Sequence, residues 1–211
     1  MTERDQNVQI NGGDICIHFL EGESRTERSE RIMKKLVDRE NLELLGNFLR
    51  LTNNKVAYAS GAYDVIHKGH ARFLNLARSL GDILVVGLNS DSSIRAYKGE
   101  DRPILKEGDR AEMLSNLESV NYITIYPELT GEEVIRRLKP DVYLCVDGSW
   151  QGDIATKAEV LAMVEVGGQI YYSPRQDPIQ STSSIIDIIG ETYGRRAVED
   201  YKKMMESGNG K

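Results

Sequence analysis

The side chains best suited to chemistry lie in one ten-residue stretch, which reads Gly61-Ala62-Tyr63-Asp64-Val65-Ile66-His67-Lys68-Gly69-His70. This stretch follows an apolar run and opens an amphipathic segment, so we expect it at a turn from a strand into a helix. His67 and His70, two of the three histidines in the chain, are spaced to share one face of that helix. Gly61 and Gly69 let a ligand approach the backbone closely. Because a helix start beyond a parallel strand favours anions, the pattern predicts a phosphate-binding turn.

Donors that converge on phosphates favour a transfer between phosphate groups, in which positioning and charge neutralisation supply nearly all of the catalysis. Two other interpretations of the turn are open. In the first, one or both histidines cap the helix or pack in the core. In the second, Asp64, His67 and His70 are metal ligands, although no further Cys or His is at hand to complete a zinc shell. We therefore expect no metal ion held by the protein's own side chains.

From about residue 56 onward, short apolar runs alternate with amphipathic segments, and Gly, Pro, Asp or Asn marks each boundary. This alternation is typical of an α/β protein, and we expect a Rossmann-like parallel sheet with helices on both faces. The expected strands are 56–59, 83–88, 122–126, 142–146 and 169–172. The expected helices are 71–80, 110–117, 132–138, 157–166 and 182–189.

Residues 1–54 differ in pattern, and we expect them to form a mostly helical appendage to a main domain at residues 55–190. A polar start and a short apolar run are followed by a charged segment with Ile32, Leu36, Leu45 and Leu49 at helical spacing. Such a stripe favours docking on the main domain or on another subunit. The last segment, residues 191–211, is expected to be a helix with a frayed tail.

Composition excludes several classes of function. The 211 residues allow one domain plus an appendage, and 27 Lys and Arg against 33 Asp and Glu give a net charge of −6, which disfavours binding to nucleic acid or anionic membranes. No apolar run approaches the roughly 18 residues that span a bilayer, and the N-terminus lacks the pattern of a signal peptide, so we expect a cytoplasmic protein. Cys16 and Cys145 are expected to be reduced core thiols.

The ten-residue stretch resembles the signature Gly-x-Phe/Tyr-Asp-x-x-His-x-Gly-His of the cytidylyltransferase-like nucleotidyltransferases. The similarity continues through Val-Gly-Leu-Asn-Ser-Asp at 86–91, Lys-Gly-Glu-Asp-Arg-Pro-Ile at 98–104 and Asp-Arg-Ala-Glu at 109–112. These later segments are most similar to the adenylyltransferase half of the bifunctional heptose enzyme of lipopolysaccharide precursor synthesis. The resemblance covers roughly residues 55–190 and implies a nucleotidyltransferase fold.

The resemblance also implies a mechanism. A substrate phosphate oxygen would attack the α-phosphorus of a nucleoside triphosphate in line, and pyrophosphate would leave. His67 and His70 would stabilise the transition state, and Lys98 would approach the α-phosphate, so these three are the expected catalytic residues. The residues expected to bind the nucleotide are Ala62, Tyr63, Gly69, Arg175, Ser181 and Thr182.

Two further elements of the family's pattern are altered here. The element Arg-x-x-Gly-x-Ser-Thr-Thr/Ser appears as residues 175–183, with Pro178 in place of the usual glycine and Gln180 as an extra residue. Ser181 is also expected to cap the following helix, and both roles use the helix start. The second element, expected after Pro-Asp-Val at 140–142, reads Val-Asp-Gly-Ser-Trp at 146–150, where the expected acid is displaced by one position.

The residues expected on the substrate side are Asp91, Arg110, Asp147 and Trp150. Arg110 instead pairs with Asp109 or another nearby acid in the alternative interpretation, and Trp150 either stacks on base or substrate or closes the core under a loop.

We expect an enzyme that joins a nucleoside monophosphate from ATP or CTP to a small phosphorylated sugar or polyol. Mg²⁺ would arrive with the triphosphate, and the protein would work as a homodimer. One alternative is a CTP-dependent enzyme for glycerol 3-phosphate, phosphoethanolamine or phosphocholine. Another is a nucleotide-binding module without turnover.

Overall fold

The structure is a computed structural model, and it describes residues 3–10, 13–20, 34–146, 157–175 and 181–208. The chain divides into two compact units, Met1–Lys35 and Leu36–Lys211. The first unit contains an antiparallel pair, β1 (Glu3–Ile10) and β2 (Gly13–Leu20), in which Glu3 is opposite Leu20. The dipeptide between the two strands in sequence is Asn-Gly, the most typical signal for a two-residue hairpin turn.

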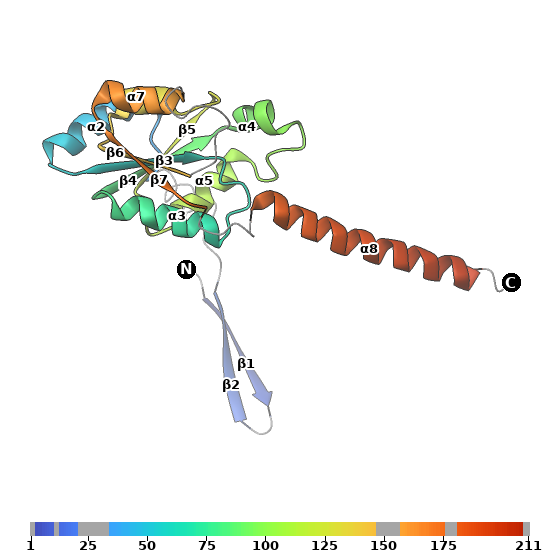
Figure 1. Cartoon of the computed structure of the whole chain (residues 1–211). Helices are drawn as coiled ribbons and strands as arrows, with labels where there is room; N and C mark the ends of the chain where they lie inside the picture. The colour runs from blue at the N-terminus through green and yellow to red at the C-terminus, as the bar shows by residue number, and fades with distance from the viewer. Residues whose placement is uncertain (1–2, 11–12, 21–33, 147–156, 176–180, 209–211) are drawn as a thin grey trace. The chain divides into compact units, whose positions relative to one another are not determined.

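The second unit is built on a five-stranded parallel sheet in the order β5-β4-β3-β6-β7 (Figure 1). The strands are β3 (Val56–Gly61), β4 (Ile83–Asn89), β5 (Tyr122–Tyr126), β6 (Val142–Val146) and β7 (Gln169–Ser173). From the central β3 the chain moves outward to β4 and β5, and it then returns to the other side of β3 for β6 and β7. Ligands of such sheets collect beyond the carboxyl ends of the strands at this reversal, which here lies between β3 and β6.

Helices cover both faces of the sheet, as Figure 1 shows. The first face packs against α3 (Lys68–Ser79) and α5 (Glu107–Ser115), with Ala57 and Ala59 of β3 in that core. The second face packs against α2 (Leu42–Leu51), α6 (Glu132–Leu138) and α7 (Ala158–Val166), with Val56 and Tyr58 of β3 in that core. Alternate residues of β3 are thus buried on opposite faces, which explains why its sequence is largely apolar.

The other elements described in the second unit are the 3-10 turn η1 (Arg39–Asn41), α4 (Asp91–Lys98) after β4, and α8 (Thr182–Gly208) after β7. The Rossmann-like parallel sheet predicted from the sequence is confirmed. The expected boundary at residue 191 falls inside α8, which is one continuous helix from Thr182 to Gly208.

The expected mostly helical appendage at residues 1–54 requires correction. Residues 3–20 contain the strands β1 and β2, and α2 belongs to the second unit because Leu42 and Leu49 are buried in its core, where α2 packs on α6. Leu36 is not helical either, since it pairs as an extended residue with Ile123 of β5. The units therefore divide after Lys35, and Ile32 lies outside the described residues.

Candidate active site

The turn between β3 and α3 carries the two histidines. His67 is the N-cap of α3, and its Nδ1 accepts a hydrogen bond of 3.1 Å from the backbone N–H of Gly69. Because Nδ1 is the acceptor, the neutral ring carries its proton on Nε2, and that atom is the donor of the ring. Tyr63 and Val65 have φ angles of 46° and 50°. The left-handed region is unfavourable for a β-branched residue, so other contacts must hold this turn in place.

The two histidine rings stack on each other, with centroids 3.9 Å apart, and the ring of Tyr63 meets His70 edge-on at 5.4 Å. The pKa of His70 is lowered from 6.5 to about 4, chiefly by burial and in addition by the charges of His67 and Lys98, against a smaller opposing effect of Asp64. Its Nδ1 has no hydrogen-bond partner among the described residues. His70 is therefore uncharged at neutral pH in the ligand-free protein. An anionic ligand beside the rings would favour protonation and reverse the effect of the neighbouring cations.

Asp64 positions the loop opposite the histidines. Its side chain is 1% exposed and accepts hydrogen bonds from the guanidinium of Arg102 and from the backbone N–H groups of Ile104 and Leu105, at 2.8–3.1 Å. Both carboxylate oxygens are thus occupied by donors, which argues against Asp64 as a metal ligand. Across the described part of the chain, no group of three or more His, Cys, Asp or Glu side chains is arranged to hold a metal ion.

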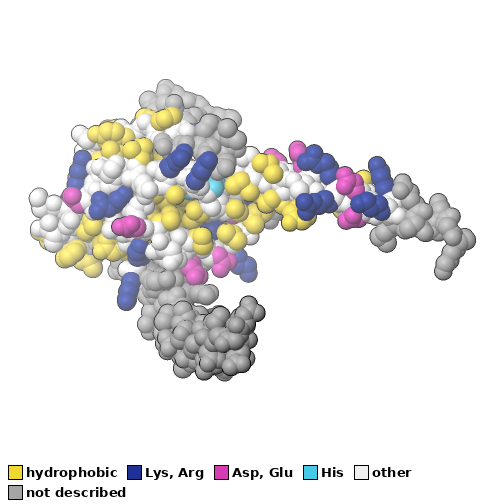
Figure 2. Space-filling view, turned by 90° about the horizontal axis from the view of Figure 1, so that it is seen from below, with side chains coloured by type: hydrophobic (Ala, Val, Ile, Leu, Met, Phe, Trp, Pro, Cys, Tyr) yellow, Lys and Arg dark blue, Asp and Glu magenta, His cyan; other side chains and the backbone are white. Residues whose placement is uncertain are grey.

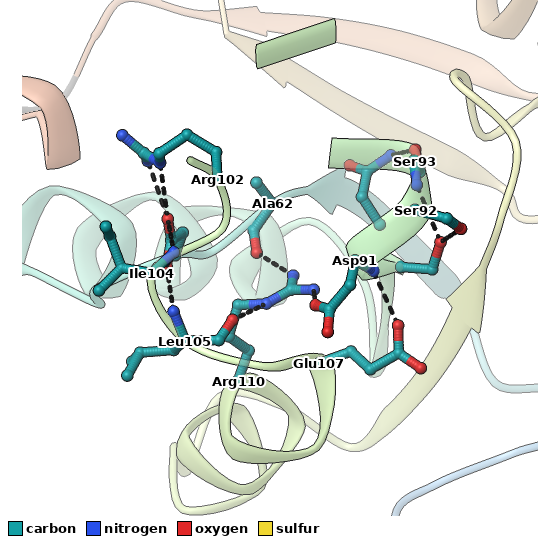
Figure 3. Close-up of polar contacts among 12 residues, drawn as sticks. Ala62, Asp91, Ser92, Ser93, Arg102, Ile104, Leu105, Glu107 and Arg110 are labelled. Atoms are coloured by element: carbon teal, nitrogen blue, oxygen red, sulfur yellow. Dashed lines mark hydrogen bonds and ion pairs between the residues drawn. The ribbon is translucent and has the colours of Figure 1, made fainter. Parts of the chain in front are cut away.

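Arg110 stands at the centre of a second set of contacts, drawn in Figure 3. Its side chain is fully buried, at 0% exposure, and its guanidinium donates to the carbonyl of Ala62, to the carbonyl of Leu105 and to the carboxylate of Asp91. The backbone N–H of Asp91 in turn donates to Glu107 at 2.8 Å. Arg110 therefore stabilises the turn between β3 and α3 through its hydrogen bond to Ala62.

These contacts show where Arg110 and Asp91 lie, while their expected substrate-binding roles stay predictions. In this structure they bind each other instead of lining the cavity described below. Of the two interpretations left open by the sequence, pairing with a nearby acid is the one observed, and the acid is Asp91 rather than Asp109. The other two residues expected on the substrate side, Asp147 and Trp150, lie outside the described residues.

A cavity of about 490 Å³ opens at the carboxyl ends of β3 and β6. Lys98, the last residue of α4, contributes its ammonium group, whose pKa is lowered by burial and by the charge of Arg102. Arg175, which follows β7, adds a second cationic side chain to the lining. The cavity brings together all the residues expected to be catalytic or to bind the nucleotide: Ala62, Tyr63, His67, Gly69, His70, Lys98, Arg175, Ser181 and Thr182.

The start of α8 completes the cavity. Ser181 caps this helix, as the sequence predicts, because its Oγ accepts a hydrogen bond of 3.1 Å from the N–H of Ser184. The hydroxyl of Thr182 donates to the carbonyl of Asp64, so it holds the helix against the turn. Both helix starts, of α3 and of α8, therefore supply lining residues to one cavity. Helix N-termini and cationic side chains together suit a polyphosphate.

Sequence reasoning missed two residues of this region. Tyr97 lines the cavity beside Lys98, and Arg102 binds Asp64, which lies 38 residues earlier in the chain. Both lie in or beside the segment 98–104 that carries the resemblance, but the sequence assigned a role there to Lys98 alone. Only the fold brings their segments together.

The chain is similar to known proteins over most of its length. The family model described as Cytidylyltransferase-like matches residues 58–188. The bifunctional protein HldE of a Nitratiruptor species is 36% identical over 163 residues, which are 74% of this chain and 35% of that protein. The bifunctional protein HldE of Helicobacter acinonychis is 40% identical over 156 residues, which are 72% of this chain and 31% of that protein.

The chain thus spans about a third of the length of these curated relatives. None of the described helices is both long enough and apolar enough to cross a bilayer. The family match extends over well more than half of the chain and includes the turn with both histidines. The chain therefore belongs to the cytidylyltransferase-like family.

Proposed function

We propose that this protein transfers a nucleoside monophosphate from ATP to the phosphate of a small phosphorylated sugar or polyol, in the manner of a heptose 1-phosphate adenylyltransferase. The observation that carries the proposal is the convergence of His67, His70, Lys98 and Arg175 with two helix N-termini on one cavity. The relatives named HldE support the ATP-dependent form, since the similarity to them covers most of the chain.

In the proposed reaction, an oxygen of the acceptor phosphate attacks the α-phosphorus in line. The new oxygen–phosphorus bond forms as the bond to the β-phosphate oxygen breaks, and pyrophosphate leaves. Negative charge spreads over the oxygens of the transferring group, and the imidazoles of His67 and His70 with the ammonium of Lys98 stabilise it. No covalent intermediate with the protein is needed.

Mg²⁺ belongs to the substrate in this proposal. The acid nearest the histidines, Asp64, has both carboxylate oxygens engaged by Arg102 and backbone donors. A magnesium ion would therefore be bound by the triphosphate oxygens and water, which is how this cation is commonly held at phosphate-transfer sites. There it neutralises charge on the triphosphate.

The test is the release of pyrophosphate when the protein is mixed with ATP or CTP and a panel of acceptors. The panel contains heptose 1-phosphate and other sugar phosphates, glycerol 3-phosphate, phosphoethanolamine and phosphocholine. Rapid release with ATP and a sugar phosphate is expected. Preference for CTP with one of the last three acceptors would support the alternative cytidylyltransferase function. Saturable nucleotide binding without release from any acceptor would show a non-catalytic module and contradict the proposal.

Assembly as a homodimer and location in the cytoplasm are also part of the proposal. The first half of α8 presents hydrophobic side chains at its surface, which Figure 2 shows, and Ile188, Ile189 and Tyr193 are each more than half exposed. Such a face favours pairing with a second copy, and two-fold dimers are the commonest soluble oligomers. The cytoplasm is where nucleoside triphosphates are supplied.

A further inference from the structure

A second cavity, of about 580 Å³, adjoins the first. The two cavities share five lining residues, which are Ser60, Gly61, Phe73, Tyr97 and Val146. The second cavity lies toward α7, and its own lining includes Tyr126, Tyr143, Lys157 and Glu159. The two cavities are therefore neighbours at the carboxyl ends of β3 and β6.

Glu159 is the unexplained residue of the second cavity. It lies in the first turn of α7, and it is 5% exposed. One carboxylate oxygen is 3.9 Å from Nζ of Lys157, and the other has no hydrogen-bond partner among the described residues. A buried carboxylate oxygen without a donor is costly, so its presence in a cavity wall indicates that a ligand supplies the donor.

Lys157 decides the charge of that ligand. Lys157 is 7% exposed, and its ammonium group lies 5.8 Å from the ring centroid of Tyr143, over the face that would otherwise attract a cation. The pair formed by Lys157 and Glu159 has no net charge, and the ammonium would repel a second cation placed beside the carboxylate. This arrangement disfavours the cationic groups of choline and ethanolamine. A neutral ligand with several hydroxyl groups suits the pair, because a hydroxyl both donates to a carboxylate and accepts from an ammonium.

Building on the proposed function, we propose that the acceptor binds in the second cavity, where Glu159 and Lys157 bind its hydroxyl groups. Tyr97 lines both cavities, and its neighbour in sequence, Lys98, lines the first. An acceptor bound to Glu159 and Lys157 would therefore extend its phosphate past Tyr97 toward the first cavity. Glu159 is then a specificity-determining residue that selects phosphate esters with a hydroxylated chain or ring.

The variant that tests the proposal is Glu159→Gln, because the amide keeps the size of the side chain and removes the charge. The matched control is Glu165→Gln on the same helix, where Glu165 is exposed and pairs with Arg136 at the surface. With the sugar phosphate preferred by the unmodified protein, Glu159→Gln should raise the KM for the acceptor about 10- to 100-fold, since a hydrogen bond to a charged group is lost. The KM for the nucleotide should stay within about twofold, and the control should match the unmodified protein.

Deoxy analogues of the acceptor give a readout that needs no variant. For the unmodified protein, the KM for the acceptor should rise by a similar factor when the hydroxyl bound by Glu159 is missing. In Glu159→Gln, the KM of the same analogue should be close to that of the full acceptor, because the interaction is already absent. An acceptor KM unchanged in the variant, equal use of all deoxy analogues, or a preference for phosphocholine would overturn the proposal.

Failure of this proposal differs from failure of the proposed function. If no acceptor yields pyrophosphate, the enzymatic function fails, but acceptor binding to the nucleotide-saturated protein is still measurable by calorimetry. Tighter binding of the hydroxylated phosphate ester than of its deoxy analogue, lost in Glu159→Gln, would then support the second cavity as its site. Equal binding of the two esters, or no binding of either, would refute that assignment.

Discussion

Replacing Arg110 by Met should destabilise the protein strongly, although the residue does not line the cavity. Met keeps most of the length of the side chain and removes every donor. Arg110 is fully buried, and its loss leaves two backbone carbonyls and the carboxylate of Asp91 without their partner. An unsatisfied buried acceptor costs about 1–3 kcal/mol, and breaking a buried ion pair typically costs about 3–5 kcal/mol. Since Asp91 is partly exposed, we expect a loss of about 3–5 kcal/mol in the free energy of unfolding.

The assay is urea unfolding followed by far-UV circular dichroism, with Arg137→Ala as the control. Arg137 is exposed and pairs with Glu133 one helical turn away, so its removal should change the free energy of unfolding by less than about 0.5 kcal/mol. The acceptor KM is measured in parallel, well below the unfolding temperature of each variant. If Arg110→Met unfolds like the unmodified protein and raises the acceptor KM alone, Arg110 is a substrate ligand and the structural argument is refuted.

Four further outcomes are expected. His67→Ala and His70→Ala should each lower turnover by a factor of about 100 or more without loss of fold, and near-normal rates in both would contradict the mechanism. Lys98→Ala should lower turnover at saturating nucleotide by a larger factor than it weakens nucleotide binding. Equal factors would mean that Lys98 stabilises the bound nucleotide and the transition state to the same extent, which would contradict its catalytic role. The pKa of His70 is lowered from 6.5 to about 4, so the stability that its neutral form contributes is present above pH 6.5 and is lost on acidification. Between pH 7 and pH 4, the free energy of unfolding should therefore fall by about 3 kcal/mol more in the unmodified protein than in His70→Asn. Light scattering should give the mass of a dimer, and Ile188→Lys with Ile189→Lys should give a monomer; a monomeric unmodified protein would exclude the dimer.

The parallel sheet was predictable because the strands at its centre are buried on both faces and are therefore largely apolar. β5 and β6 have the bounds that their apolar runs predict. Helix starts were harder to place. α3 begins at Lys68 rather than at residue 71 because its N-cap is His67, which is not among the usual capping residues. α4 was not predicted, since its sequence offers few apolar residues, and its start depends on the cap provided by Ser90.

The residues that line the candidate site were predictable because they lie in segments that resemble motifs of the family. The turn from Gly61 to His70 contains its own chemistry, and the structure assembles it with Lys98, Arg175 and the start of α8. The burial of Arg110 was not predictable because an arginine on an amphipathic helix is normally exposed, and its three acceptors come from separate segments. The proximity of Lys157 and Glu159 is typical of solvated charges, and only the fold shows that both are buried in a cavity wall.

The contacts that hold the turn between β3 and α3 affect when the protein becomes competent during its own synthesis. The turn is held at Asp64 by Leu105, 41 residues later, at Ala62 by Arg110, 48 residues later, and at Asp64 again by Thr182, 118 residues later. A growing chain of which only β3 and α3 have left the ribosome lacks all of these partners. Nothing then keeps Tyr63 and Val65 in their left-handed conformations. The lining of the first cavity is therefore complete only once the start of α8 has left the ribosome.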